Sequence, residues 1–76
     1  MQVDVLLFSS LSDKLGYRRL TVDCEPQEDV YTLWQRLAQE PGLEHVRVMC
    51  AVNQDYVPLD YVLHDHDEVA FFPAAR

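Results

Sequence analysis

Residues 68–73 read Glu-Val-Ala-Phe-Phe-Pro, and this stretch near the end of the chain decides the fold. It predicts a strand over residues 68–72 that Pro73 stops, because β-branched and aromatic residues favour strands and proline donates no backbone hydrogen bond. Its side chains are apolar on both faces, as are those of Val5-Leu6-Leu7-Phe8 within a strand predicted over residues 2–9. Parallel neighbours inside a sheet typically carry apolar residues on both faces. The two segments are therefore expected to lie side by side at the centre of one sheet.

The sequence between these two strands predicts the rest of the sheet. Residues 10–16 form a connection with a short helical turn that Gly16 ends, and residues 17–23 form a second strand. A third strand is predicted over residues 46–53, where side chains alternate in character. Residues 54–67 are expected to be an irregular segment with short extended pieces.

One main helix is predicted after Asp29, whose carboxylate is expected to accept a hydrogen bond from the amide of Thr32. Pro41-Gly42 is expected to end this helix. Apolar residues recur at helical spacing and give it one buried face: Val30, Leu33, Trp34 and Leu37. One helix packed across one mixed sheet makes two layers, so the fold class is α+β. The order of elements predicts a β-grasp (ubiquitin-like) roll, formed by a single domain over residues 1–76.

Composition narrows the function classes. The chain has 76 residues and a formal net charge of −7, which disfavours binding to nucleic acid. It contains no apolar run long enough to span a membrane and no basic stretch leading into an apolar run, so a cytoplasmic protein is expected. Cys24 and Cys50 lack the spacing of an iron–sulfur site, and two reduced thiols are favoured over one disulfide.

Three stretches together carry a resemblance to a known family. They are Val5-Leu6-Leu7-Phe8-Ser9 with Leu11 and Lys14-Leu15-Gly16; Ala51-Val52-Asn53-Gln54; and Leu63-His64-Asp65-His66-Asp67-Glu68-Val69-Ala70-Phe71-Phe72-Pro73. Their order and spacing resemble the small, sulfur-carrying subunits of molybdopterin synthase (MoaD family) over nearly the whole chain. The related sulfur carrier of thiazole synthesis, for thiamine, shares the fold but looks less like the last two stretches.

The resemblance implies a sulfur carrier in molybdenum cofactor biosynthesis. Members of this family end in Gly-Gly, and an E1-like adenylyltransferase uses ATP to activate the terminal carboxylate, which then becomes a thiocarboxylate. The tail enters the large subunit of molybdopterin synthase and donates sulfur to cyclic pyranopterin monophosphate. The carrier itself is expected to bind no cofactor. The alternative function is a ubiquitin-like protein-interaction module without sulfur chemistry.

The printed sequence stops at Ala74-Ala75-Arg76, where the family pattern continues with two glycines. Three explanations stay open: a shortened chain, a product completed from a longer precursor, and a relative that has lost carrier chemistry. The stop directly before the expected pair favours the first. No nucleophile with a neighbouring base is visible, so catalysis by this chain alone is not predicted.

The resemblance also assigns a partner-binding surface: Phe8, Tyr56, Phe72, Pro73, Ala74, Ala75 and Arg76. Side chains alternate along a strand, so Phe71 and Phe72 point to opposite faces and one of them is exposed unless a partner covers it. The alternative is that Phe8, Tyr56 and Phe72 all belong to the core.

The polar segment His64-Asp65-His66-Asp67 contains metal-ligand side chains, but a polar turn is favoured and no metal site is predicted. His66 stands where the family often has glycine, so a positive φ is expected there. A second acidic group is expected to be a solvated edge that could attract a basic partner. It consists of Asp23, Glu25, Glu28 and Asp29.

Overall fold

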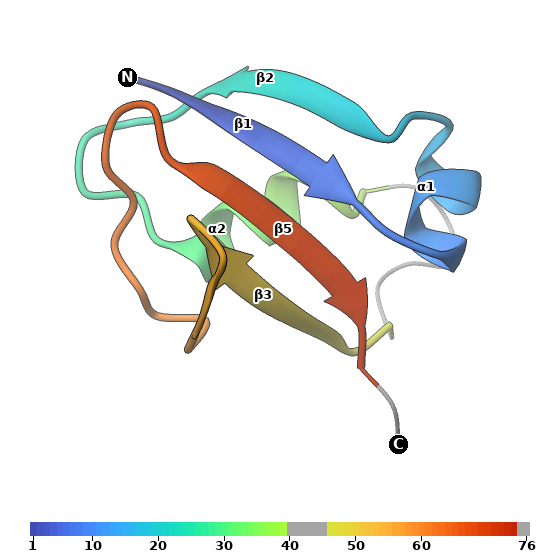
Figure 1. Ribbon diagram of the computed structural model, residues 1–76. Coiled ribbons are helices and arrows are strands. Elements are labelled where there is room, and N and C mark those ends of the chain that lie inside the picture. The colour runs from blue at the N-terminus through green and yellow to red at the C-terminus, as the bar shows by residue number, and fades with distance from the viewer. Residues whose placement is uncertain (40–45, 75–76) are drawn as a thin grey trace.

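The computed structural model describes residues 1–39 and 46–74, which form a five-stranded mixed sheet with helix α2 packed across one face (Figure 1). The elements in chain order are β1 (Gln2–Leu7), α1 (Ser10–Leu15), β2 (Arg19–Asp23), α2 (Val30–Leu37), β3 (Val48–Val52), β4 (Asp55–Val57) and β5 (Glu68–Pro73). The strand order is β2-β1-β5-β3-β4. Strands β1 and β5 are parallel, with Val5 opposite Val69, and all other pairs are antiparallel. This is the predicted β-grasp roll.

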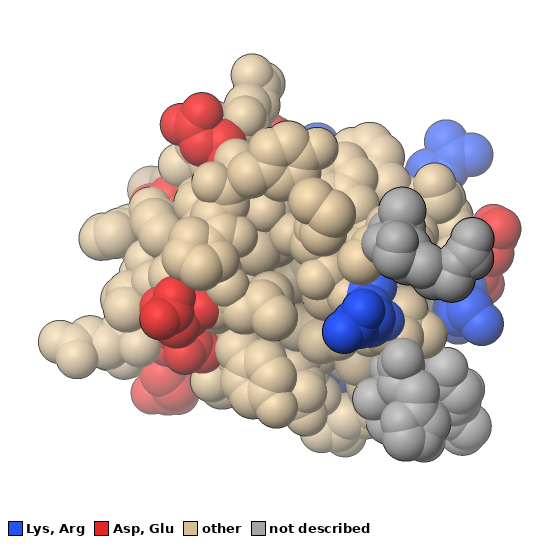
Figure 2. Space-filling model, turned by 90° about the horizontal axis from the view of Figure 1, so that it is seen from below, with Lys and Arg blue, Asp and Glu red and all other residues tan. Residues whose placement is uncertain are grey.

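Charged side chains lie at both ends of the strands. Asp23 and Asp65 lie at one end, near the start of β1, because Asp23 pairs with Gln2 and the Asp65 carboxylate accepts a hydrogen bond from the Gln2 amide. Arg19 lies toward the other end, opposite Leu6 and close to α1. On the face shown in Figure 2, most acidic side chains lie toward the left, and the prominent lysine and arginine side chains lie toward the right with an acidic side chain beside them.

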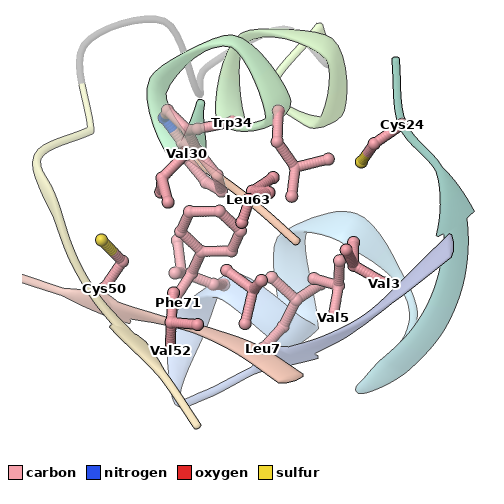
Figure 3. Packing of buried hydrophobic residues seen from close by; sticks show 13 residues of the cluster. Val3, Val5, Leu7, Cys24, Val30, Trp34, Cys50, Val52, Leu63 and Phe71 are labelled. Carbon is pink, nitrogen blue, oxygen red and sulfur yellow. The ribbon is translucent and has the colours of Figure 1, made fainter. Parts of the chain in front are cut away.

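The core lies between α2 and the sheet. Phe71 is fully buried at its centre, and the Trp34 ring packs against it with ring centroids 5.0 Å apart. Figure 3 shows Val30 and Trp34 pointing from α2 toward Phe71, with Leu7 from the sheet on the other side. Trp34 is therefore a core residue. Cys24 and Cys50 are both buried and form no disulfide with each other, as expected.

Helix α2 begins where the sequence predicts. The Asp29 carboxylate accepts a hydrogen bond from the Thr32 amide at 2.8 Å, and this bond lowers the pKa of Asp29. The helix ends at Leu37, where the Ala38 amide still donates to the Trp34 carbonyl. The predicted stop at Pro41-Gly42 lies outside the described residues. In the part of the chain that is described, no helix is long and apolar enough to cross a membrane.

The ends of the strands differ from the prediction by one or two residues. Strand β1 stops at Leu7, because the chain turns at Ser9, whose φ of 55° is incompatible with a strand. Strand β5 includes Pro73, which pairs with Val48 as the last residue of its strand. Proline is tolerated at a strand terminus because its missing donor breaks no ladder there. The predicted turn at Gly16 is confirmed, since Gly16 caps α1 with a φ of 86°.

The polar segment before β5 is a turn held by a buried carboxylate. Asp67 accepts hydrogen bonds from the Asn53 side-chain amide at 2.9 Å and from the His64 backbone amide at 2.8 Å. His66 has a φ of 69°, which confirms the expected left-handed conformation. Within residues 1–39 and 46–74, no group of three acidic, histidine or cysteine side chains converges on a possible metal position.

The prediction of a solvated acidic edge is wrong for Glu28. Its side chain is only 4% exposed and forms an ion pair with Arg36, with Nε and Oε2 3.0 Å apart. The physical reason is that α2 brings Arg36 back over the turn that precedes the helix. Asp23 and Glu25 are exposed, as predicted.

Candidate partner-docking site

Three aromatic rings stand together on the face of the sheet opposite α2. Phe8 stacks on Phe72 with ring centroids 4.8 Å apart, and Tyr56 lies 6.0 Å from Phe72 on its other side. Phe8 is 42% exposed and Tyr56 is 70% exposed, whereas Phe72 is half-buried between them. We call Phe8, Phe72 and Tyr56 the aromatic patch. The alternative that all three rings belong to the core is therefore excluded.

Backbone geometry places each ring. Phe71 and Phe72 point to opposite faces because side chains alternate along β5, so burial of Phe71 sends Phe72 outward. Phe8 follows β1 and its amide donates to the Phe71 carbonyl at 3.2 Å, which carries the ring beside Phe72. Tyr56 pairs with Ala51 across the short hairpin of β3 and β4.

Small side chains leave a hollow beside the aromatic patch. Ala51 and Ala70 face each other across β3 and β5, and neither fills the space between the rings. The resulting hollow has a volume of about 320 Å³. It is lined by Leu6, Phe8, Ala51, Gln54, Tyr56, Glu68, Ala70 and Phe72. A concave apolar surface with aromatic walls is suited to receive apolar side chains of a partner.

Met49 extends this surface and was missed by the sequence analysis. It is 46% exposed and pairs with Phe72 across β3 and β5. The alternation of Val48 and Cys50 with Met49 was the signal that could have revealed it, because the core side of β3 was already occupied. Methionine adapts its shape to a partner and is common at such surfaces.

The tail of the chain starts at the aromatic patch. Pro73 and Ala74 are half-buried, and the Ala74 amide donates to the Arg47 carbonyl at 2.9 Å. This bond holds the chain next to the beginning of β3 as it leaves the sheet (Figure 1). The predicted partner-binding residues Phe8, Tyr56, Phe72, Pro73 and Ala74 thus lie together. Ala75 and Arg76 lie outside the described residues.

Neither cysteine is suited to sulfur chemistry. Burial raises the pKa of the Cys50 thiol, whose Sγ lies 3.4 Å from the Val57 carbonyl and donates to it. Burial, together with the nearby Glu28 carboxylate, also raises the pKa of Cys24. The thiolate is the reactive form, and a raised pKa suppresses it at neutral pH. The described residues therefore offer an exposed apolar surface next to the C-terminal segment rather than a reactive thiol.

Comparison with known proteins identifies the family. The family model described as the ThiS family matches residues 5–76. The chain is 34% identical over 76 residues to the molybdopterin synthase sulfur carrier subunit of Escherichia coli, covering 93% of each chain. It is 40% identical over 77 residues to the subunit of the same name from Mycobacterium tuberculosis, covering 96% of this chain and 93% of that one.

A solved structure has the same fold. It is the protein–protein complex of subunits 1 and 2 of the molybdopterin-converting factor from Helicobacter pylori, in which one chain matches with a TM-score of 0.68 at 21% identity. The match covers 100% of this chain and 97% of that chain. The sequence matches and the shared fold lead to one conclusion: the chain belongs to the ThiS family and is a homologue of molybdopterin synthase sulfur carrier subunits.

Proposed function

We propose that this chain is the sulfur carrier subunit of a molybdopterin synthase, whose C-terminal thiocarboxylate donates sulfur to cyclic pyranopterin monophosphate. One observation carries the proposal. This chain is a homologue of two such subunits, and its exposed Phe8 ring stacks on the half-buried Phe72 ring, which lies on β5, the strand that leads to the C-terminus. A carrier needs such an arrangement, since the surface that docks must also aim the tail.

The physics of docking assigns different tasks to the body and to the tail. A flexible tail loses conformational entropy when it enters a narrow site, so the rigid body has to supply most of the affinity. Aromatic side chains on a preformed sheet supply apolar contact area at little entropic cost. The proposed partner is the large subunit of molybdopterin synthase, and the Helicobacter pylori relative is known as a complex of subunits 1 and 2.

The carrier also requires activation by a second partner. We assign this step to an E1-like adenylyltransferase that joins the terminal carboxylate to AMP and releases pyrophosphate from ATP. A sulfur donor then displaces AMP and leaves a thiocarboxylate. The ATP belongs to the activating enzyme, so the carrier binds no cofactor of its own. We place these steps in the cytoplasm, where buried thiols such as Cys24 and Cys50 stay reduced.

The intact mass of the protein purified from its native source tests this function. A mass that exceeds the printed sequence by two glycines establishes the carrier tail, and a further gain equal to the exchange of one oxygen for sulfur establishes the thiocarboxylate. The second arm is calorimetric titration of the same protein with the large subunit from the same organism. A protein that neither gains sulfur nor binds the large subunit is instead an interaction module without sulfur chemistry.

A further inference from the structure

A second hollow on this acidic protein is lined by basic side chains. It lies where β1, α1 and the start of β2 meet, and its volume is about 570 Å³. Its lining residues are Leu6, Leu7, Phe8, Ser9, Ser12, Arg18 and Arg19. The whole chain has only six lysines and arginines against thirteen acidic residues, so two arginines in one hollow are a local reversal of its charge. We call this site the arginine hollow.

The two arginines differ in how far they are neutralised. Arg19 shares its charge with Asp4 at 3.4 Å and with Glu68 at 3.9 Å. Arg18 is exposed and forms no ion pair with any side chain in residues 1–39 and 46–74. The Arg18 backbone is fixed, because its carbonyl accepts a hydrogen bond from the Leu7 amide at 2.9 Å. An uncompensated guanidinium on a fixed backbone is available to an external anion.

The arginine hollow is continuous with the docking surface. Leu6 and Phe8 line both this hollow and the hollow beside the aromatic patch. A partner that covers Phe8 and Phe72 can therefore also contact Arg18, because the two hollows adjoin. On this side the partner contacts the apolar side chains of Leu6 and Phe8 and the positive charge of Arg18.

We propose that the arginine hollow receives an acidic segment of the large subunit, in which an aspartate or glutamate pairs with Arg18 next to an apolar side chain on Leu6 and Phe8. This inference rests on the proposed function and names the chemistry of its partner. Guanidinium groups pair with carboxylates through two parallel hydrogen bonds. A free inorganic anion satisfies the guanidinium but leaves the apolar wall exposed, so a peptide segment fits the hollow better.

Charge at the edge of an interface acts mainly on the association rate and on the dependence of binding on salt. The test compares wild type, Arg18→Glu, Arg18→Gln and Lys14→Glu by calorimetric titration with the purified large subunit, at low and at high salt. Lys14→Glu is the matched control, because it makes the same change in net charge two residues beyond Ser12 and does not line the hollow. Circular dichroism establishes that each variant is folded.

Arg18→Glu is expected to bind at least about tenfold more weakly than wild type, since it sets like charges against each other, and Lys14→Glu less than about 1.5-fold more weakly. The loss for Arg18→Glu is expected to shrink at high salt. Arg18→Gln adds no repulsion and is expected to weaken binding by about threefold, which keeps the test valid should Arg18→Glu fail to fold. A carboxylate-to-arginine exchange in the partner segment is expected to restore binding to Arg18→Glu.

Two results overturn the inference. The first is an equal effect of Arg18→Glu and Lys14→Glu, which reports only net charge. The second is competition by inorganic phosphate that depends on Arg18, which makes the hollow a site for small anions. If the proposed function itself is wrong, wild type does not bind the large subunit at all, and this result is distinct from the two above. If wild type binds in a way that is sensitive to Phe72, either of the two results overturns this inference and leaves the proposed function intact.

Discussion

The Phe8 ring stacks on the Phe72 ring, with centroids 4.8 Å apart and planes inclined by 12°. The two residues come from opposite ends of the chain, and the parallel pairing of β1 with β5 brings them together, with Leu7 opposite Phe71. Stacking holds the two rings against each other at the wall of the hollow that both of them line. A preformed pair of rings loses little side-chain entropy when a partner covers it.

Replacing Phe72 tests the aromatic patch. Phe72→Ala is expected to weaken binding of the large subunit by ~2 kcal/mol or more, because truncation of a central interface aromatic leaves a gap in both partners. Calorimetric titration measures the change. Tyr31→Ala is the matched control, since Tyr31 is 51% exposed but lies on α2, away from the patch. Equal affinities for the two variants, both folded, contradict the assignment of the docking face.

The Arg36 side chain links α2 to the end of β2. Its Nη2 donates to the Asp23 carbonyl at 2.8 Å, while its Nε pairs with the buried Glu28 carboxylate at 3.0 Å. Arg36→Ala leaves that carboxylate buried without its partner, and we expect a loss of about 1–3 kcal/mol in the free energy of unfolding. The expected loss of stability is small for a buried carboxylate, because the Arg36 side chain is 46% exposed and solvent screens the ion pair. Urea unfolding at neutral pH measures the loss.

Two further variants separate the ion pair from general effects on the helix. Gln35→Ala changes an exposed neighbour on α2 and is expected to shift stability by no more than about 0.5 kcal/mol. Glu28→Gln in the Arg36→Ala background removes the stranded charge and is expected to recover part of the loss. No recovery in the double variant means that the guanidinium acts through packing alone.

The sequence predicts those features of the fold that depend on neighbours along the chain. Strand alternation separates Phe71 from Phe72, and the Asp29 cap follows from its place before the helical apolar pattern. Features that depend on distant segments were not predictable in the same way. Burial of Glu28 requires Arg36 to arrive from α2, and the stacking of Phe8 on Phe72 requires the parallel pairing of β1 with β5.

The candidate site shows the same division. The aromatic residues were assigned through the family resemblance, and only the structure shows that Phe8 and Phe72 stack. The arginine hollow had no sequence signal, because Arg18 and Arg19 read as ordinary polar residues of a strand. Its basic character arises from the arrangement of β1, α1 and β2 in space.

His66 holds a left-handed backbone conformation at a φ of 69°. Such a conformation is strained for a side chain with a Cβ, and glycine adopts it without strain, so His66→Gly is expected to raise the free energy of unfolding by about 0.5–1 kcal/mol. Its imidazole forms an exposed pair with Asp65, which contributes little. Thermal unfolding measures the gain. His64→Gly is the control, since His64 does not have a positive φ, and a loss of about 0.5–1 kcal/mol is expected there. Destabilisation of similar size in both variants contradicts strain at His66.

Asp29 links the stability of the fold to acid pH. The hydrogen bond from Thr32 lowers the pKa of Asp29 below its ordinary value of 3.8, so the folded state favours the ionised carboxylate. The stabilisation is therefore complete well above pH 3.8, begins to decrease as the pH approaches that value, and is lost as the pH falls through the lower pKa of the folded state. Asp29→Asn keeps a capping side chain but cannot titrate. We expect the stability of wild type relative to Asp29→Asn to be constant from neutral pH down to about pH 5 and to decline below it, as measured by urea unfolding across this range. A difference that stays constant to the acid limit means that the Asp29 carboxylate caps α2 equally well in both protonation states.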